Sequence, residues 1–535
     1  MPGDAEFPIE WLDPSDREIT WEWDDMHMPG ALSALAGDYA GIIAAGMAYG
    51  HQRMGTPVQM RIRIWNGYAY FGLATDVPEA EQGAMWERRT VAARAAIQDA
   101  DAYWHERAMP EVTATYAWVA ARPVETLTLS ELTDTWDEVW ARIGRCWAIH
   151  FYAIRGPYQV LEDLADLYES AVPEAAPAEA LGLIGGGDHE LQAVERGLEE
   201  LTGLVARTPG LADRLAEPGV TVGDLAGSPA TTEFVTALDA FLAEHGHLGQ
   251  NDDDLNLASW AEEPGLLLTE LGKRLRNPGA TTSDERQRRL AGEADLLADR
   301  ARDVLADDPT RLAHFEALLA DARRIGHLTE THNYWIDRAA QASLRRFVVR
   351  VGRRLAEAGS IADPADVFHL HRDEVPDVLC TGDDRRSLVA GRRRDLERFS
   401  TMQAPRVVGA PSEDGGGDRF DGVRMASAEP DELRGTGASA GIVRGPARVT
   451  LTQEDFGAVQ RGDIIVCPSS NPSWVPLFAI AGGLITNTGG VLSHAAVVAR
   501  EFALPAVVGT GDATTRIANG RLVEIDGTSG VVRLL

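Results

Sequence analysis

The stretch GGLITNTGGVLSHAAVVAREFALPAVVGT, residues 482–510, decides how the C-terminal part of the chain folds. GGLIT and LPAVVGT are short β-branched runs next to glycine, as is typical of buried strands. Between them, SHAAVVAREFA has helical character, and Pro505 is expected to stop the helix. Ser493 is a good N-cap residue. We therefore predict strand, turn, helix and strand in succession, with His494 on the first turn of the helix.

A histidine at the start of a helix is well placed for phosphate chemistry. Free backbone N–H groups and the helix dipole favour an anion there, and glycines let another group approach the backbone. A neutral imidazole can accept a phosphoryl group and release it later. His494 is therefore a candidate catalytic group, with a candidate phosphate site formed by Gly489, Gly490, Ser493 and Arg500. On spacing alone, a capping histidine, or a buried one bonded to backbone, is favoured.

Length, net charge and cysteine content limit the class of protein that this chain can be. The chain has 535 residues, enough for two to four domains, and a formal net charge of −32. So acidic a chain is not expected to bind nucleic acid or anionic membranes. Its three cysteines are widely spaced, and the N-terminus has no signal-peptide pattern. Without an apolar run long enough to span a membrane, a cytoplasmic protein is expected.

Changes in residue composition and hydrophobic pattern along the chain predict the domain organisation. RIRIWNGYAYFGL, residues 61–73, alternates apolar and polar residues around Asn-Gly and predicts a hairpin. Residues 1–400 are otherwise mainly helical, 401–434 are rich in Gly, Pro, Ser and Asp and predict a flexible linker, and 435–535 predict a compact α/β domain. The expected fold class is therefore multidomain, with a large mainly α-helical substrate domain followed by a small α/β domain.

The C-terminal segment resembles the swivelling phosphohistidine domain of the phosphoenolpyruvate-utilising and dikinase family. The resemblance rests on GTGASAGIVRGPARV, GDIIV, NPSWVPLFAIAGGLITNTGGVLSHAAVVAREFALPAVVGT and GRLVEIDGTSGVV, in that order. It implies that His494 carries a covalent phosphoryl group. It also implies that the domain moves between an ATP site and an acceptor site.

The order of the parts is similar to the last two domains of rifampicin phosphotransferase and to the histidine-bearing subunit of split aryl dikinases, such as phenylphosphate synthase and hydroxyphenylethanone dikinase. Five motifs agree with this group: FPIEW, WDDMHMPGALSAL, HGHLGQNDDDLNLASWAEEP, ETHNYWIDRA and IADPADVFHLHRDEV. The sequence shows neither a Gly-rich loop followed by lysine nor a barrel after His494, so ATP and Mg²⁺ are expected on a separate ATP-grasp-type subunit. The resemblance implies AMP and phosphate as co-products and a phenolic acceptor.

The acceptor site is expected in the helical region. A hydroxyl acceptor needs an aromatic-lined pocket and a base, and these motifs supply candidates: His27, His245, His247, His332, Tyr334 and Trp335. Each histidine has a structural alternative, such as packing on Trp335 within a helix. The His-x-His pair followed by aspartates also fits a metal site, but a solvated turn is favoured, so no metal ligand is assigned.

The leading hypothesis is a dikinase-type phosphotransferase that phosphorylates a phenolic hydroxyl. A second enzyme hypothesis is transfer to an antibiotic or another alcohol. A hypothesis of a different class is a phosphocarrier or binding module that transforms no small molecule.

Overall fold

The computed structural model describes residues 7–25, 27–173, 175, 179–187, 189–215, 217, 219–249, 254–276, 281–402, 404–411, 431–451, 453–470, 474–491 and 493–535. The described residues form two compact units, and each takes three separate stretches of chain. Unit 1 comprises the described residues of 1–159, 252–257 and 332–413, and unit 2 those of 160–251, 258–331 and 414–535.

Unit 1 contains a four-stranded antiparallel sheet in the order β2-β3-β1-β4. Its strands are β1 (Thr20–Trp23), β2 (Gln59–Trp65), β3 (Tyr68–Ala74) and β4 (Val407–Gly409). The predicted hairpin is present as β2 and β3, with Trp65 paired to Tyr68. Asn66 and Gly67 both have positive φ, 49° and 81°, as a type I′ turn requires.

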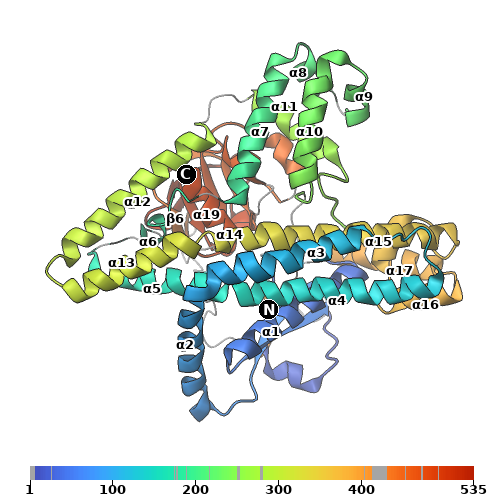
Figure 1. Ribbon diagram of the computed structural model, residues 1–535, viewed down its shortest axis with the longest axis horizontal. Coiled ribbons are helices and arrows are strands. Elements are labelled where there is room, and N and C mark those ends of the chain that lie inside the picture. The colour runs from blue at the N-terminus through green and yellow to red at the C-terminus, as the bar shows by residue number, and fades with distance from the viewer. Residues whose placement is uncertain are drawn as a thin grey trace. The chain divides into compact units, whose positions relative to one another are not determined.

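Helices make up the rest of unit 1. They are α1 (Ala34–Met54), α2 (Glu79–Tyr103), α3 (Met109–Ala120), α4 (Leu129–Ala153), α15 (Ala339–Glu357), α16 (Glu374–Thr381) and α17 (Arg386–Ser400), with π-helical turns η2 (Trp104–Ala108) and η4 (Asn333–Arg338). Figure 1 shows α3, α4 and α15 alongside one another. Trp136, Trp140 and Phe347 lie in their shared core. A Cβ at Gly46 would lie 2.8 Å from Trp147, so glycine lets α1 approach α4 closely.

Unit 2 combines helices with a second sheet. Its helices include α5 (Arg155–Ala171, which begins in unit 1), α6 (Glu179–Gly182), α7 (Glu190–Arg207), α8 (Leu211–Leu215), α9 (Val222–Ala226), α10 (Thr232–His245), α11 (Pro264–Arg276), α12 (Ser283–Leu305), α13 (Pro309–Ile325) and α14 (Leu328–His332, whose last residue is in unit 1). Buried Glu195 on α7 pairs with Arg274 of α11 at 2.8 Å and Arg286 of α12 at 3.4 Å. These ion pairs tie three helices together.

The sheet of unit 2 has eight strands in the order β5-β12-β11-β7-β8-β9-β10-β6. They are β5 (Glu432–Arg434), β6 (Thr436–Ser439), β7 (Ile442–Val449), β8 (Ile464–Cys467), β9 (Gly483–Thr486), β10 (Ala506–Val508), β11 (Leu522–Asp526) and β12 (Val531–Leu534), with helices α18 (Val475–Phe478), α19 (His494–Glu501) and α20 (Ala513–Arg516). Strands β7 to β10 are parallel neighbours, and the other pairs are antiparallel.

The parallel strands carry apolar side chains on both faces. Ile465 and Leu484 belong to one buried cluster, which includes the apolar face of α19, whereas Ile464 and Ile485 belong to another. Successive side chains of a strand point to opposite faces, which explains why these strands are continuous apolar runs. Helix α19 connects parallel neighbours β9 and β10, so it begins just after the carboxyl end of β9.

The predicted fold class is confirmed: a large, mainly helical part is followed by a small α/β part. Most of the predicted 401–434 linker, residues 412–430, lies outside the described residues. At its two ends, Val407–Gly409 and Glu432–Arg434 form strands β4 and β5. The compact units interleave along the chain, whereas the predicted boundaries at 400 and 435 divide it sequentially, and those boundaries stay predictions.

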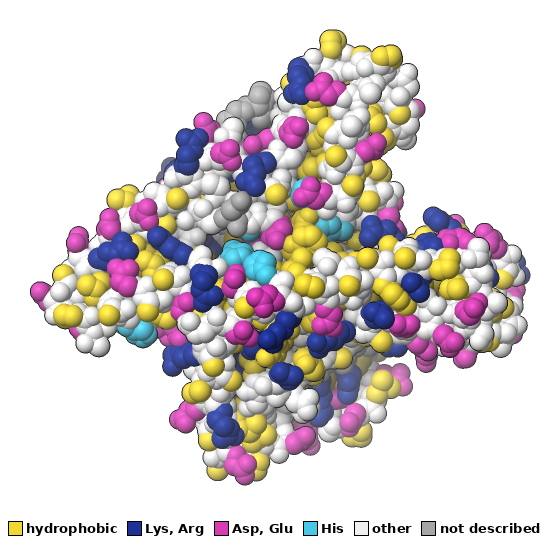
Figure 2. Space-filling model, in the orientation of Figure 1, with side chains coloured by type: hydrophobic (Ala, Val, Ile, Leu, Met, Phe, Trp, Pro, Cys, Tyr) yellow, Lys and Arg dark blue, Asp and Glu magenta, His cyan; other side chains and the backbone are white. Residues whose placement is uncertain are grey.

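Figure 2 shows acidic and basic side chains interspersed among hydrophobic and other groups on the face that it draws. Among the described residues, each helix is too short or too polar to cross a lipid bilayer.

Candidate active site

The predicted helix start is confirmed in detail. Helix α19 begins at His494, and Ser493 is its N-cap, accepting a hydrogen bond from the Ala496 backbone N–H. Ser493 Oγ also donates to the Gly490 carbonyl oxygen at 2.8 Å. Gly489 has φ of 104°, and a Cβ there would lie 2.7 Å from Ser493 Oγ. Gly489, Gly490 and Ser493 therefore build the turn that places His494 at the helix N-terminus.

The His494 ring is partly buried and contacts an acidic side chain. Its Nδ1 lies 3.3 Å from Glu330 Oε2, and the two side chains are only 10% and 5% exposed. An ionised carboxylate can only accept, so Nδ1 carries the proton in this contact. The lone pair is then on Nε2, which has no hydrogen-bond partner within the described part of the chain. The arrangement leaves Nε2 as a nucleophilic nitrogen.

A partly buried ion pair joins the end of α19 to the N-cap of α7. His189 Nε2 contacts Glu501 Oε1 at 2.6 Å. Burial alone would lower the pKa of His189, but the charge and hydrogen bond of Glu501, helped by Glu330 and Glu190, raise it to about 9. His189 is therefore cationic at neutral pH, which places a positive charge near Glu330.

Arg500 supplies a second cation. Its guanidinium donates to the Ala438 carbonyl oxygen on β6 at 3.2 Å. Burial lowers the pKa of Arg500 to about 10, although the charges of Glu330 and Glu501 oppose that effect. The side chain thus stays protonated at neutral pH. It is held against β6 and is within electrostatic reach of the glutamate that contacts His494.

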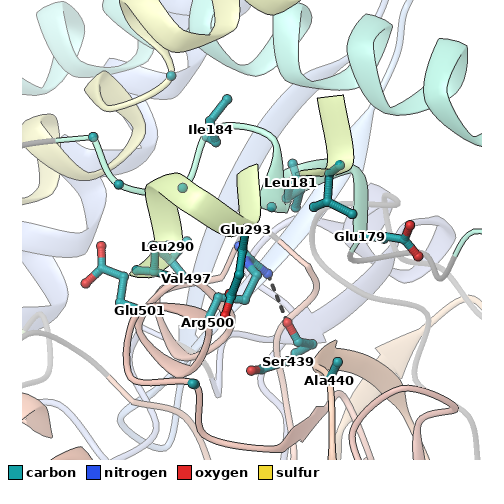
Figure 3. A pocket seen from close by; sticks show the side chains of 18 of the residues that line it. Glu179, Leu181, Ile184, Leu290, Glu293, Ser439, Ala440, Val497, Arg500 and Glu501 are labelled. Atoms are coloured by element: carbon teal, nitrogen blue, oxygen red, sulfur yellow. Dashed lines mark hydrogen bonds between the residues drawn. The ribbon is translucent and has the colours of Figure 1, made fainter. Parts of the chain in front are cut away.

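A cavity of about 720 Å³ within unit 2 is lined by Glu330, Arg500 and the His189–Glu501 pair, whereas His494 is not among its described lining residues. Its wall mixes apolar and charged side chains, among them Leu290 of α12, Val497 and Arg500 of α19, and Glu330. Figure 3 shows Arg500 reaching toward the strand that carries Ser439, with Glu501 on the same helix. The volume is within the usual range for small-molecule sites. None of the six residues predicted from sequence to contact the acceptor is among the described residues of this wall.

Two of those six residues belong to unit 2. His245 is buried at the end of α10, where its ring lies 4.9 Å from that of Phe241, and burial lowers its pKa. His247 is partly buried. Asp254, which closes the adjacent aspartate run, is described, whereas Asp252 and Asp253 lie outside the described residues.

The other four predicted acceptor residues belong to unit 1. His27 is exposed and contacts Asp24 at 3.0 Å. Tyr334 is buried and meets the Trp335 ring edge-on at 5.2 Å. His332 is also buried, and its ring lies 4.4 Å from that of His150. The structure therefore groups the predicted acceptor residues in two sets, one in each compact unit.

Sequence reasoning missed Glu330, His189 and Glu501. Glu330 lies inside the motif ETHNYWIDRA, where only the histidine and aromatic residues drew attention. Its contact with His494 joins residues 164 positions apart. Without a fold, no local pattern indicates that pairing. Only an alignment of homologues with an acidic residue at the position of Glu330 could have indicated this contact from sequence.

Two family models match the chain. Residues 459–530 match the mobile domain of PEP-utilising enzymes, and residues 158–330 match the fourth domain of rifampicin phosphotransferase. The first match includes His494, and the second ends at Glu330. These two segments are therefore similar to the mobile domain of PEP-utilising enzymes and to the fourth domain of rifampicin phosphotransferase.

Individual relatives agree with this placement. The chain is 30% identical to chondramide synthase cmdD of Chondromyces crocatus across 100% of its own length and 14% of that protein's. It is 30% identical to the uncharacterized phosphotransferase YvkC of Bacillus subtilis over 56% of this chain and 36% of YvkC. Identity to a rifampicin phosphotransferase of Streptomyces sviceus is 31%, over 72% of this chain and 44% of the relative. The chain thus spans less than half the length of each of these three relatives.

Proposed function

We propose that this chain is a phosphotransferase component in which His494 is phosphorylated and passes the phosphoryl group to a hydroxyl acceptor. In the full reaction, ATP with Mg²⁺ is bound by a separate ATP-grasp-type subunit; ATP and one water molecule are consumed, one phosphoryl group stays on His494, and AMP and phosphate are released. The split arrangement rests on the resemblance to the aryl dikinases described above. The transfer itself is supported by the two domain matches.

The observation that carries the proposal is the state of the His494 ring. Glu330 accepts from Nδ1 and so directs the lone pair to Nε2. Phosphoryl transfer then forms an Nε2–P bond as the bond from phosphorus to the donor oxygen breaks. In the second step, the acceptor oxygen attacks phosphorus, the Nε2–P bond breaks, and a base takes the hydroxyl proton. Glu330 holds the ring proton at Nδ1 throughout.

The cavity beside α19 is the acceptor site that the geometry favours. Arg500 and His189, both cationic at neutral pH, line it with Glu330. Positive charge there would offset the charge that develops on a transferring phosphoryl group. The proposed acceptor is phenolic, because a phenol has a pKa near 10 and needs only modest help from a base.

A second candidate acceptor is an antibiotic hydroxyl. The match of residues 158–330 to a rifampicin phosphotransferase domain, and the relatives of that name, favour it. A panel of simple phenols, aliphatic alcohols and rifampicin, each incubated with ATP, Mg²⁺ and an ATP-grasp-type partner, separates these acceptors. Labelled product from ATP with this chain alone would contradict the split arrangement.

The phosphocarrier step can be tested without a partner. Phosphoramidate, a small phosphoryl donor, should label His494, and ³¹P NMR should show phosphorus on Nε2. His494→Asn should remove that signal, whereas replacing exposed His314 should leave it unchanged. Phosphorylation on Nδ1, or equal labelling of His494→Asn, would refute the mechanism. A phosphorylated His494 that no small hydroxyl compound discharges would instead favour a non-catalytic carrier.

A further inference from the structure

Two buried histidines and a partly buried aspartate in unit 1 lie together without a role in the proposed reaction. His150 is on α4, His332 ends α14, and Asp337 is on the π-helical turn η4. One ligand atom from each lies within 4.8 Å of the others. His150 and His332 are 6% and 3% exposed, and the Asp337 side chain is 13% exposed.

The π-helical turn explains how two of these residues converge. His332 and Asp337 are five positions apart, and an α-helix would direct such residues to different sides. A π turn makes i→i+5 hydrogen bonds, so residues five apart lie one above the other. Single π turns inside α-helices occur frequently at functional sites. The irregular turn therefore presents a nitrogen ligand and an oxygen ligand to His150.

His150 itself points to a ligand. Neither of its ring nitrogens makes a hydrogen bond with the described residues, although Nε2 lies 3.3 Å from Asp337 Oδ1. A buried imidazole whose ring nitrogens make no hydrogen bond costs free energy unless something binds it.

We propose that His150, His332 and Asp337 bind a divalent transition-metal ion of the zinc class. Two imidazoles and one carboxylate are a ligand set that such ions take in proteins. Two ligands of a tetrahedral ion lie roughly 3.3 Å apart when each bond is about 2.0 Å, which is the separation of His150 Nε2 and Asp337 Oδ1. Only His332 has to move closer for all three to bind.

The surroundings fix the shape of this site. The His150 ring packs edge-on against Phe151 at 4.3 Å and against Trp147 at 5.1 Å. These neighbours limit the movement of the imidazole. Three protein ligands leave a fourth position for an oxygen ligand such as water. This metal is distinct from the Mg²⁺ that accompanies ATP in the proposed reaction.

Metal binding can be measured on the intact, untagged chain without any reaction. After treatment with a chelator, the chain should bind one Zn²⁺ by calorimetry, and Co²⁺ should produce the visible absorption of a tetrahedral site. X-ray absorption of the zinc-loaded chain should show two imidazoles and at least one oxygen ligand. No specific binding, or a ligand shell without imidazole, would overturn the proposal even if phosphotransfer is normal.

Variants locate the ion. His150→Gln and Asp337→Asn should each weaken zinc binding at least tenfold, with helical circular dichroism showing that the chain still folds. His105→Gln is the matched control, because His105 and Asp101 lie at the same 3.3 Å separation but are exposed. Its affinity should stay at the level of the unmodified chain. Unchanged zinc affinity in both cluster variants would refute this site.

Discussion

Replacing Glu501 with glutamine tests the electrostatics beside the proposed phosphocarrier. In the native chain, Glu501 is the strongest influence that raises the pKa of His189 to about 9. Glutamine keeps the size of the side chain and removes its charge. Burial, which lowers the pKa of His189, is then opposed by less negative charge. The pKa should therefore fall by roughly 2 units or more, to the region of free histidine, about 6.5.

The same shift predicts how stability depends on pH. A pKa about 2.5 units above that of the unfolded chain corresponds to about 3 kcal/mol of stabilisation. Because the folded-state pKa is raised, this stabilisation is fully present below about pH 6.5. It is lost as the pH rises from 6.5 through about 9. Glu501→Gln should therefore be destabilising near pH 6 and close to neutral in effect near pH 10.

NMR titration of ¹³C-labelled histidine rings measures the pKa, with the His189 signal assigned from His189→Gln. Thermal unfolding at pH 6 and pH 10 measures the change in stability. Glu293→Gln is a matched control, since Glu293 is an exposed carboxylate lining the same cavity and pairs with Arg289. A His189 pKa near 6.5 in the native chain, or one unmoved in Glu501→Gln, would refute the reasoning.

Two further predictions concern the start of α19. Glu330→Gln replaces a charge-assisted hydrogen bond to His494 Nδ1 with a neutral one that is worth about 1.5 kcal/mol less. Phosphorylation of His494 by phosphoramidate should therefore slow about tenfold. An unchanged rate would mean that Glu330 does not set the tautomer of the ring. Gly489→Ala adds a Cβ 2.7 Å from Ser493 Oγ at a residue with a φ of 104°. It should lower the free energy of unfolding, measured by thermal unfolding, by about 1–3 kcal/mol. Gly457→Ala is the control, because a Cβ there meets nothing within 4 Å, and it should not lower the stability.

Local rules predicted the local structure well. The Asn66-Gly67 turn and the Ser493 cap depend on a few neighbouring residues, and the backbone adopts the conformations that those residues favour. The apolar run of β9 likewise indicated a buried strand. In each case the physical cause lies within about four residues of the feature that it produces.

The site needed information that local rules lack. Glu330 meets His494 only after the sheet and helices have packed. From the sequence, His150 looks like a core histidine on the apolar face of α4. His332 and Asp337 converge through a π turn, which the 3.6-residue repeat used to recognise α-helices does not reveal. The interleaved units are equally hidden, because compositional changes mark boundaries along the chain and not contacts across it.

That interleaving has a consequence for proteolysis. Because each unit is assembled from three stretches of chain, cutting at the points where the chain passes from one unit to the other would release no single polypeptide that folds as either unit. A nicked protein would keep its pieces together through packing alone and would separate only in denaturant. Gel filtration before and after denaturation would reveal this difference, and the fragments would refold efficiently only when recombined.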